Sequence, residues 1–164
     1  AQGAAVPWGA GCESLPPSGV RTSETCGAGL VEGRAIAPPG APGAVKEVIA
    51  AANHIRHRTY VWGGGHLSFR SRGYDCSGAV GYALHGAGLL STTMVSGQLA
   101  AWGEPGGGRW ITVYGNAEHV FMEVAGLRFD TRDDEPGVRG PRWHMARAAE
   151  RVLRHFTARH PAGL

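Results

Sequence analysis

The sequence predicts an α+β fold, in which a helix with a cysteine in its first turn packs on an antiparallel β-sheet. Apolar residues recur at helical spacing in the first half, from residue 44 to about residue 102. From residue 109 onward, segments rich in aromatic and β-branched residues alternate with turn signals. Helices followed by consecutive strands are typical of a fold whose helices gather on one face of an antiparallel sheet.

The composition indicates a single folded domain with many loops. Of its 164 residues, 43% are hydrophobic and 18% are charged, which is enough apolar chain to bury a core. Glycine and proline contribute 27 and 10 residues that are spread along the sequence. Prolines and glycines are frequent in residues 1–43, for which we expect an extended arm, while residues 44–164 form the domain.

Three helices are predicted ahead of the sheet. The first covers about residues 43–58, and its apolar residues recur at a spacing of three and four: Val45, Val48, Ile49 and Ala52. The second covers about residues 75–87, where Asp75 is a good N-cap and Gly88 follows the end. A short third helix is expected over residues 96–102, capped by Ser96.

Four strands are predicted after the glycine-rich break at residues 104–108. They cover residues 109–114, 118–124, 127–131 and 151–157. The second and third form a hairpin across Ala125-Gly126, in which Val124 faces Leu127.

This hairpin register sorts the side chains onto two faces. One face is apolar and carries Val120, Met122, Val124, Leu127 and Phe129. The other carries His119, Phe121, Glu123, Arg128, Asp130 and Arg132. His119 and Asp130 occupy diagonal positions on this second face, about 7–8 Å apart at Cα. A carboxylate at that position can hold the imidazole in one tautomer and stabilise its charged form.

Cys76 has the surroundings that a nucleophilic thiol requires. It follows Tyr74-Asp75 at the predicted start of the second helix, and Gly63-Gly64-Gly65 precede it in the chain. A thiol becomes nucleophilic near neutral pH when its pKa is depressed and a base lies nearby. A helix N-terminus favours the anion, and its free N–H groups can also stabilise an oxyanion. The sequence therefore predicts a cysteine enzyme in which His119 is the base.

The other two cysteines lie in the arm. Cys12 and Cys26 could form a disulfide in an exported protein, which would stabilise the fold by roughly 3 kcal/mol. Cys76 would then be the odd thiol that is kept for chemistry. The alternative is three unrelated thiols in a reducing compartment.

Several partner classes are disfavoured by the sequence. The net charge of +3 and the late arginines could attract an anionic surface, or they form a solvated basic face. No nucleic-acid motif is present, and no apolar run is long enough to span a membrane. His54 and His57 lack further ligands at metal-binding spacing, so neither a metal nor another cofactor is expected. We expect a monomer.

The motifs around Cys76 and His119 resemble those of the NlpC-type bacterial cell-wall cysteine peptidases, a family of papain-like enzymes. The resemblance covers residues 44–157 and rests on three segments: Tyr60-Val61-Trp62-Gly63-Gly64, Gly73-Tyr74-Asp75-Cys76-Ser77-Gly78 and His119-Val120. It implies a papain-like fold, with Cys76 as nucleophile and His119 as base. It also implies that Tyr60 lies beside the nucleophile, and that Asp75 and Ser77 help to bind the free amine of a peptide stem.

Two positions depart from the family pattern. The third polar residue of the family is often His, Asn or Gln, whereas the matching place here holds Asp130. The usual glycine after His-Val is replaced by Phe121, which is bulkier and lies on the proposed site face. The shape of the pocket is therefore expected to differ from that of the family.

The resemblance implies an endopeptidase that hydrolyses the γ-D-glutamyl–diamino acid bond of peptidoglycan stem peptides. One alternative keeps the Cys-His pair for amide hydrolysis or acyl transfer on another substrate. A second alternative is a non-catalytic cell-wall-binding module. A secreted or wall-associated location is expected. The chain begins at Ala1, so either a signal peptide has been removed or the chain was trimmed.

Overall fold

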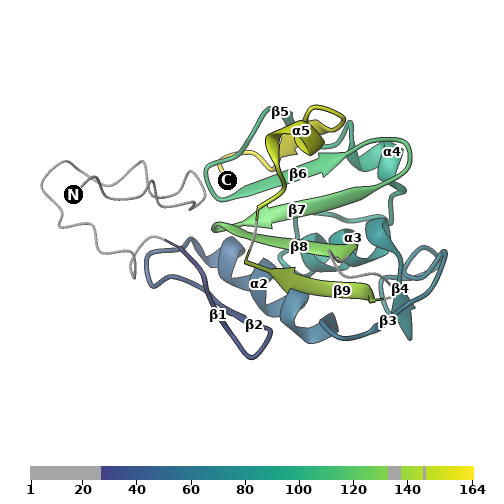
Figure 1. Ribbon diagram of the computed structural model, residues 1–164, viewed down its shortest axis with the longest axis horizontal. Coiled ribbons are helices and arrows are strands. Elements are labelled where there is room, and N and C mark those ends of the chain that lie inside the picture. Colours follow the sequence, from purple (N-terminus) through teal and green to yellow (C-terminus); the bar gives the residue numbers. More distant parts are fainter. Residues whose placement is uncertain (1–26, 133–137, 146) are drawn as a thin grey trace, which may run out of the picture.

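A six-stranded antiparallel sheet forms the centre of the computed structural model, which describes residues 27–132, 138–145 and 147–164 (Figure 1). The strand order is β5-β10-β6-β7-β8-β9, with β5 (Glu104–Pro105) and β9 (Arg139–His144) at the edges. The four strands between them are β10 (Thr157–His160), β6 (Ile111–Gly115), β7 (Val120–Val124) and β8 (Leu127–Arg132). The predicted α+β class with an antiparallel sheet is confirmed.

Two helices cover one face of this sheet and a shorter one lies over the other face. In Figure 1, α2 (Gly43–Ile55) and α3 (Cys76–Gly86) lie behind the sheet, and α5 (Glu150–Leu153) lies in front of it. The single turn α4 (Ser96–Leu99) lies near the end of β6. A short parallel pair, β3 (Thr59–Tyr60) and β4 (Gly73–Tyr74), leads into α3. Among the described helices, none is both long and apolar enough to cross a bilayer.

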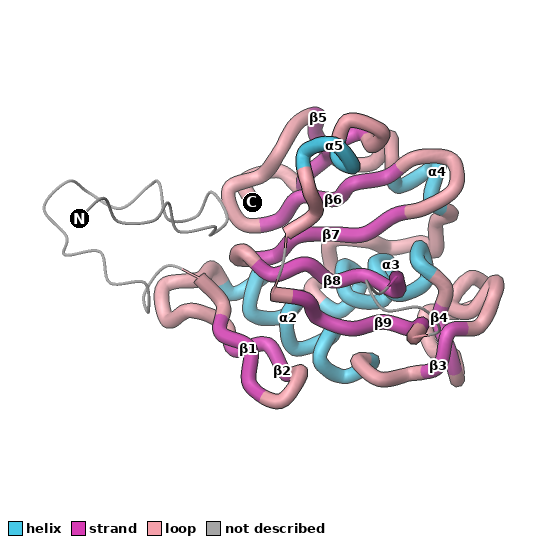
Figure 2. Tube along the Cα trace, viewed as in Figure 1, coloured by secondary structure: helices cyan, strands magenta, loops and turns pink. Residues whose placement is uncertain are grey.

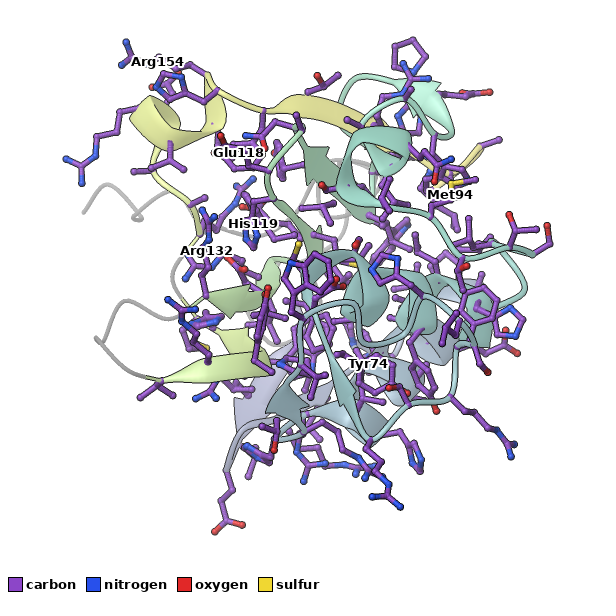
Figure 3. The ribbon with its side chains drawn as sticks, turned by 90° about the vertical axis from the view of Figure 1, so that its right-hand side faces the viewer. Tyr74, Met94, Glu118, His119, Arg132 and Arg154 are labelled. Carbon is purple, nitrogen blue, oxygen red and sulfur yellow. The ribbon has the colours of Figure 1, made fainter. Side chains whose placement is uncertain are left out.

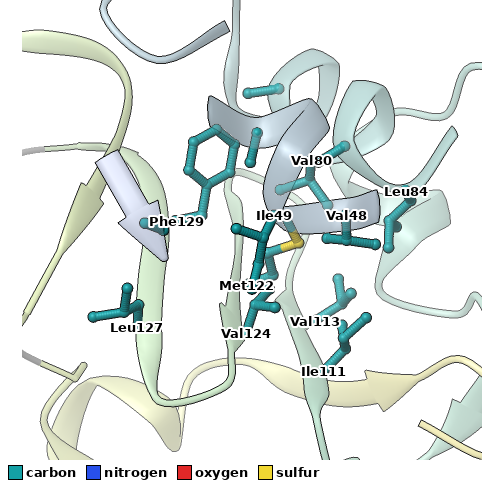
Figure 4. Packing of buried hydrophobic residues seen from close by; sticks show 14 of the residues in the cluster. Val48, Ile49, Val80, Leu84, Ile111, Val113, Met122, Val124, Leu127 and Phe129 are labelled. Atoms are coloured by element: carbon teal, nitrogen blue, oxygen red, sulfur yellow. The ribbon is translucent and has the colours of Figure 1, made fainter. Parts of the chain in front are cut away.

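The main core lies between the two long helices and the sheet. Figure 4 shows side chains of α2 and α3, including Val48, Val80 and Leu84, packed against Met122 of β7 and Phe129 of β8. All five are at most 1% exposed. Burying one such side chain stabilises the fold by about 1.5–3 kcal/mol. This packing holds the start of α3, where Cys76 lies, against the middle strands of the sheet. His119 directly precedes one of these strands, β7.

The predicted hairpin register is confirmed. In β7 and β8, Val124 pairs with Leu127, Glu123 with Arg128 and Met122 with Phe129. The turn residues Ala125 and Gly126 both have positive φ angles, 48° and 90°, as a two-residue hairpin turn requires. The apolar face packs on the helices. The face that carries His119 and Asp130 is also buried, because α5 and the segment before it cover that side.

One prediction about the ends of the sheet is wrong, and one edge strand was not predicted. Residues 151–157 do not form a strand: α5 ends at Leu153, and β10 begins only at Thr157, which pairs with Gly115 of β6. Residues 151–156 pair with none of the described strands, and the side chain of Val152 is 39% exposed. Strand β9 was not predicted, because it contains Gly140 and Pro141. An edge strand tolerates proline, since one side of its backbone needs no partner.

The third predicted helix is shorter than expected and Ser96 is not its cap. Helix α4 ends at Leu99, and its N-cap residue is Val95. The Ser96 hydroxyl instead donates a hydrogen bond to the carbonyl oxygen of Ala117, at 3.2 Å. The side chain that closes the turn is that of Gln98, whose Oε1 accepts from the Val95 N–H at 3.0 Å. Ser96 therefore ties α4 to the loop before β7.

The described part of the predicted arm forms a hairpin, which Figure 2 shows beside α2. Strands β1 (Gly29–Val31) and β2 (Arg34–Ile36) pair across a two-residue turn. Asn53 of α2 fixes β2, because its side chain bonds both the N–H and the carbonyl of Ala35 at 2.9 Å. Cys12 and Cys26, and with them the predicted disulfide, lie outside the described residues.

Candidate active site

Cys76 is the first residue of α3. Asp75 caps this helix, because its Oδ1 accepts a hydrogen bond from the Gly78 N–H at 2.8 Å. A helix leaves its first N–H groups without internal partners, so those of Cys76 and Ser77 remain available for an anion. Cys76 is a partly exposed free thiol. The predicted N-cap and the predicted start of this helix are thus confirmed.

The glycine-rich loop approaches this helix so closely that side chains are excluded. A Cβ on Gly78 would overlap the carbonyl oxygen of Gly64, and a Cβ on Gly64 would overlap that of Gly73. The N–H of Asp75 donates to the Gly64 carbonyl at 3.3 Å. The loop therefore fixes the backbone on both sides of Cys76.

His119 lies just before β7, where a small turn holds it. The Asn116 Oδ1 accepts from the N–H groups of Glu118 and His119, each at 2.9 Å. The side chain of His119 is 5% exposed, and its Nε2 lies 2.8 Å from Asp130 Oδ1. This is the contact that the hairpin register predicted.

Asp130 is itself held by two arginines of β8. Its Oδ1 accepts from the Arg132 N–H at 3.0 Å, and its Oδ2 lies 3.6 Å from Arg128 Nε. The carboxylate is 7% exposed. With these partners it remains oriented toward His119.

The pKa of His119 is raised above its ordinary value of 6.5, although burial by itself lowers it. The hydrogen bond to Asp130 is the largest opposing cause, and the next is a hydrogen bond with the side chain of Cys76. Cys76 is thus within interaction distance of His119. With its pKa raised, His119 holds its proton more readily than a free imidazole does.

Tyr60 also belongs to this neighbourhood. Burial raises its pKa, and the negative charges of Cys76 and Asp75 raise it further, whereas Arg139 and Arg132 act in the opposite direction. The tyrosine therefore lies within electrostatic reach of the thiol. Ser77, which follows Cys76, is 4% exposed.

Sequence reasoning missed His66, which lies directly against Asp75 and Ser77. Its Nε2 is 2.8 Å from each oxygen of the Asp75 carboxylate and 3.0 Å from Ser77 Oγ. The only sequence signal was its place after three glycines that precede Cys76 in the chain. The contact depends on how that loop closes, which local patterns do not reveal.

Phe121 is part of an aromatic cluster behind His119. Its ring centroid lies 5.2 Å from that of Tyr114, 5.1 Å from that of Phe156 and 6.1 Å from that of His119. Phe121 is 2% exposed. The bulky residue at this position therefore fills space under the α5 segment.

A cavity of about 360 Å³ lies between the α5 segment and this face of the sheet. Its lining includes His119, Asp130, Phe121 and Phe156, together with four arginines: Arg128, Arg132, Arg147 and Arg151. Figure 3 shows Arg132 on the same side of the molecule as His119, below the segment that carries Arg154. Arg147 pairs with the buried Glu123 at 2.8 Å. The cavity is strongly basic and adjoins the His119–Asp130 pair.

We expect Asp130→Asn to shift the pH dependence of catalysis. Asparagine carries no charge and supports the imidazolium less, so the pKa of His119 falls. The protonated histidine is then lost at lower pH, and the alkaline limb of kcat/KM moves to lower pH. We expect kcat/KM at its optimum to fall about 10- to 100-fold, as for loss of a hydrogen bond to a charged group. A pH–rate profile that keeps its alkaline limb would contradict this role for Asp130.

Comparison with solved structures identifies the fold. An NlpC/P60 family protein from Bacillus cereus matches at a TM-score of 0.54 and 19% identity, over 73% of this chain and 40% of its own. The chain has the NlpC/P60 fold. The peptidoglycan hydrolase RipB of Mycobacterium tuberculosis matches at a TM-score of 0.54 and 22% identity, over 76% of this chain and 73% of its own. A hypothetical invasion protein of the same organism matches equally well, over 90% of this chain and 76% of its own.

The likeness lies in the structure more than in the sequence. No protein-family model and no curated protein matches the sequence. The resemblance drawn from the motifs is confirmed as a resemblance in fold, and the papain-like arrangement of the NlpC/P60 fold accounts for helix α3 packed against the sheet. The chain spans less than half of the Bacillus cereus protein.

Proposed function

We propose that the protein is a cysteine peptidase that hydrolyses amide bonds in the stem peptides of peptidoglycan. The observation that carries the proposal is Cys76 at the start of α3, within interaction distance of a His119 that is bonded to Asp130 at 2.8 Å. The NlpC/P60 fold and the likeness to a peptidoglycan hydrolase support this substrate class. We propose that the bond it cleaves is the γ-D-glutamyl–diamino acid bond.

In the first step, the Cys76 thiolate attacks the carbonyl carbon of the scissile amide. The carbonyl oxygen becomes an oxyanion, and the N–H groups of Cys76 and Ser77 at the start of α3 are the donors placed to stabilise it. His119 then transfers its proton to the leaving amine, so the C–N bond breaks and an acyl-enzyme thioester remains. Asp130 stabilises the imidazolium until this transfer.

In the second step, neutral His119 accepts a proton from water, and the hydroxide attacks the thioester carbonyl. The C–S bond breaks, which releases the carboxylic acid and restores the thiolate–imidazolium pair. Neither step needs a cofactor. Tyr60, Asp75 and Ser77, which flank the nucleophile, are proposed to contact the substrate beside the scissile bond.

The basic cavity behind His119 fits an acidic substrate. Stem peptides carry several carboxylates, and the described lining of the cavity contains four arginines beside the carboxylate of Asp130. Among the described residues, no ion pair is formed by the side chains of Arg132 or Arg151. These two arginines are proposed to attract the anionic part of the stem. The protein is proposed to act as a monomer, outside the cell or at the wall.

The bulk of Phe121 favours one alternative function, that of a cysteine amidase or acyltransferase. Its ring fills space behind His119 that a glycine would leave open, and a changed pocket suits a cysteine amidase or acyltransferase with another amide substrate. A non-catalytic cell-wall-binding module would not need a buried His119–Asp130 pair beside a free thiol.

Digestion experiments test the proposal. Intact peptidoglycan and purified stem peptides are incubated with the wild-type protein and with Cys76→Ala, and the products are identified by mass spectrometry. We expect new amino and carboxyl ends at the γ-D-glutamyl–diamino acid bond with the wild type alone. If neither substrate gives a product that depends on Cys76, the peptidase proposal is wrong.

A further inference from the structure

The carboxylate of Asp75, next to the nucleophile, already has a full set of donors. Oδ1 accepts from the Gly78 N–H at 2.8 Å and from the Ser77 hydroxyl at 3.2 Å. Oδ2 accepts from the Gly63 N–H at 3.2 Å. His66 Nε2 lies 2.8 Å from both oxygens and donates between them. A carboxylate offers about four lone-pair sites, so these contacts use its capacity.

The backbone around His66 fixes the ring in this position. Thr93 Oγ1 donates to the His66 carbonyl at 2.8 Å, and the His66 N–H donates to the Gly63 carbonyl at 3.3 Å. Gly65 has a φ of 87°, and a Cβ there would lie 2.8 Å from both Gly78 Cα and Tyr74 Cδ1. The loop thus has little freedom to swing His66 away from Asp75.

The cluster of Asp75, Ser77 and His66 is still partly accessible to solvent. The side chains of His66 and Asp75 are 21% and 14% exposed. An ammonium group that approached Asp75 would meet the edge of the imidazole instead of a free carboxylate oxygen. Its N–H groups would lose water without gaining an acceptor, which is costly for a charged group. An amide nitrogen has a single N–H and no charge, so the free-energy cost of losing its water at the same place is far smaller.

We infer that His66 takes the place of a substrate ammonium at Asp75 and Ser77, so the enzyme selects stem peptides whose amino end is acylated. This inference rests on the proposed function and names the substrate class within it. His66 is a specificity-determining residue that acts through Asp75. Stem peptides still attached to the glycan have such an acylated amino end, whereas released stem peptides have a free amine. The role that the family resemblance implies for Asp75 and Ser77 is thereby changed from binding an amine to excluding it.

Two peptides that differ in one group test the inference. Both contain the L-alanyl-γ-D-glutamyl–diamino acid sequence, one with a free amino terminus and one N-acetylated, and kcat/KM is measured for each. We expect the wild type to prefer the acetylated peptide about tenfold or more, the size of a lost hydrogen bond to a charged group. In His66→Ala, the freed Asp75 binds the ammonium, so this preference falls at least tenfold or reverses. His54→Ala is the matched control, since His54 is an exposed histidine of α2 outside the site.

The outcomes separate the two proposals. A wild-type preference for the free amine, or equal kcat/KM for the two peptides, overturns the inference and leaves the peptidase proposal standing. An unchanged preference in a folded His66→Ala overturns the assignment to His66. If His66→Ala does not fold, the wild-type comparison still decides whether the free amine is disfavoured, and His66→Leu, which has no donor for Asp75, takes the variant's place. No Cys76-dependent cleavage of either peptide overturns the proposed function itself.

Discussion

Replacing His119 with alanine is expected to lower kcat/KM by on the order of 10⁴-fold or more. The imidazole is proposed both to stabilise the Cys76 thiolate and to protonate the leaving amine, so one change removes both contributions. The site is buried, and water cannot replace a donor bonded to Asp130 at 2.8 Å without a change in packing. Hydrolysis of the preferred stem peptide, followed by product mass, gives the measurement.

A matched variant separates this effect from a general loss of structure. His155→Ala removes an exposed histidine on the same side of the molecule, whose hydrogen bonds to described residues are made by its backbone: its N–H donates to the Val152 carbonyl at 3.1 Å, and its carbonyl accepts from Asn116 Nδ2 at 3.2 Å. We expect that variant to keep its activity within about twofold, as surface substitutions usually have small effects. If His119→Ala retained more than about a tenth of the wild-type kcat/KM, His119 would not be the base.

Gly78→Ala is expected to destabilise the fold by about 3 kcal/mol or more. The added methyl group would overlap the backbone carbonyl oxygen of Gly64 and would lie 3.1 Å from Asp75 Oδ1. A backbone atom cannot rotate aside as a side chain can, so the loop and α3 would have to separate. A loss of this size lowers the thermal unfolding midpoint by about 6–12 °C for a domain of this length.

Gly81→Ala is the control for that measurement, because Gly81 lies in the same helix. A Cβ there meets Leu90 Cδ2 at 3.6 Å, which is an ordinary contact. Alanine is the better helix former by about 0.5–1 kcal/mol, so we expect an unchanged or slightly raised unfolding midpoint. Similar midpoints for Gly78→Ala and the wild type would show that the loop does not approach α3 as closely as described.

Local patterns were sufficient for the elements that position the site. Asp75 caps α3 because an aspartate before a helix can reach the N–H three residues on, and this is a property of a short segment. The hairpin register follows from one two-residue turn and the alternation of apolar side chains, which is how His119 and Asp130 could be placed together.

Features that depend on distant parts of the chain could not be predicted. Strand β9 contains Gly140 and Pro141, and only its place at the edge of the sheet makes a strand possible there. The cavity under α5 exists because residues 147–156 return over the sheet. His66 contacts Asp75 only after the glycine loop has closed, so no spacing in the sequence indicated it.

The central claim is that Cys76 and His119 form a thiolate–imidazolium pair, and the alkylation rate of Cys76 tests it most directly. The wild type and His119→Ala are treated with iodoacetamide at about pH 6, and the modified Cys76 is quantified by peptide mass mapping. We predict alkylation at least about tenfold faster in the wild type, because the imidazolium stabilises the thiolate. Equal rates in the two proteins would contradict the account.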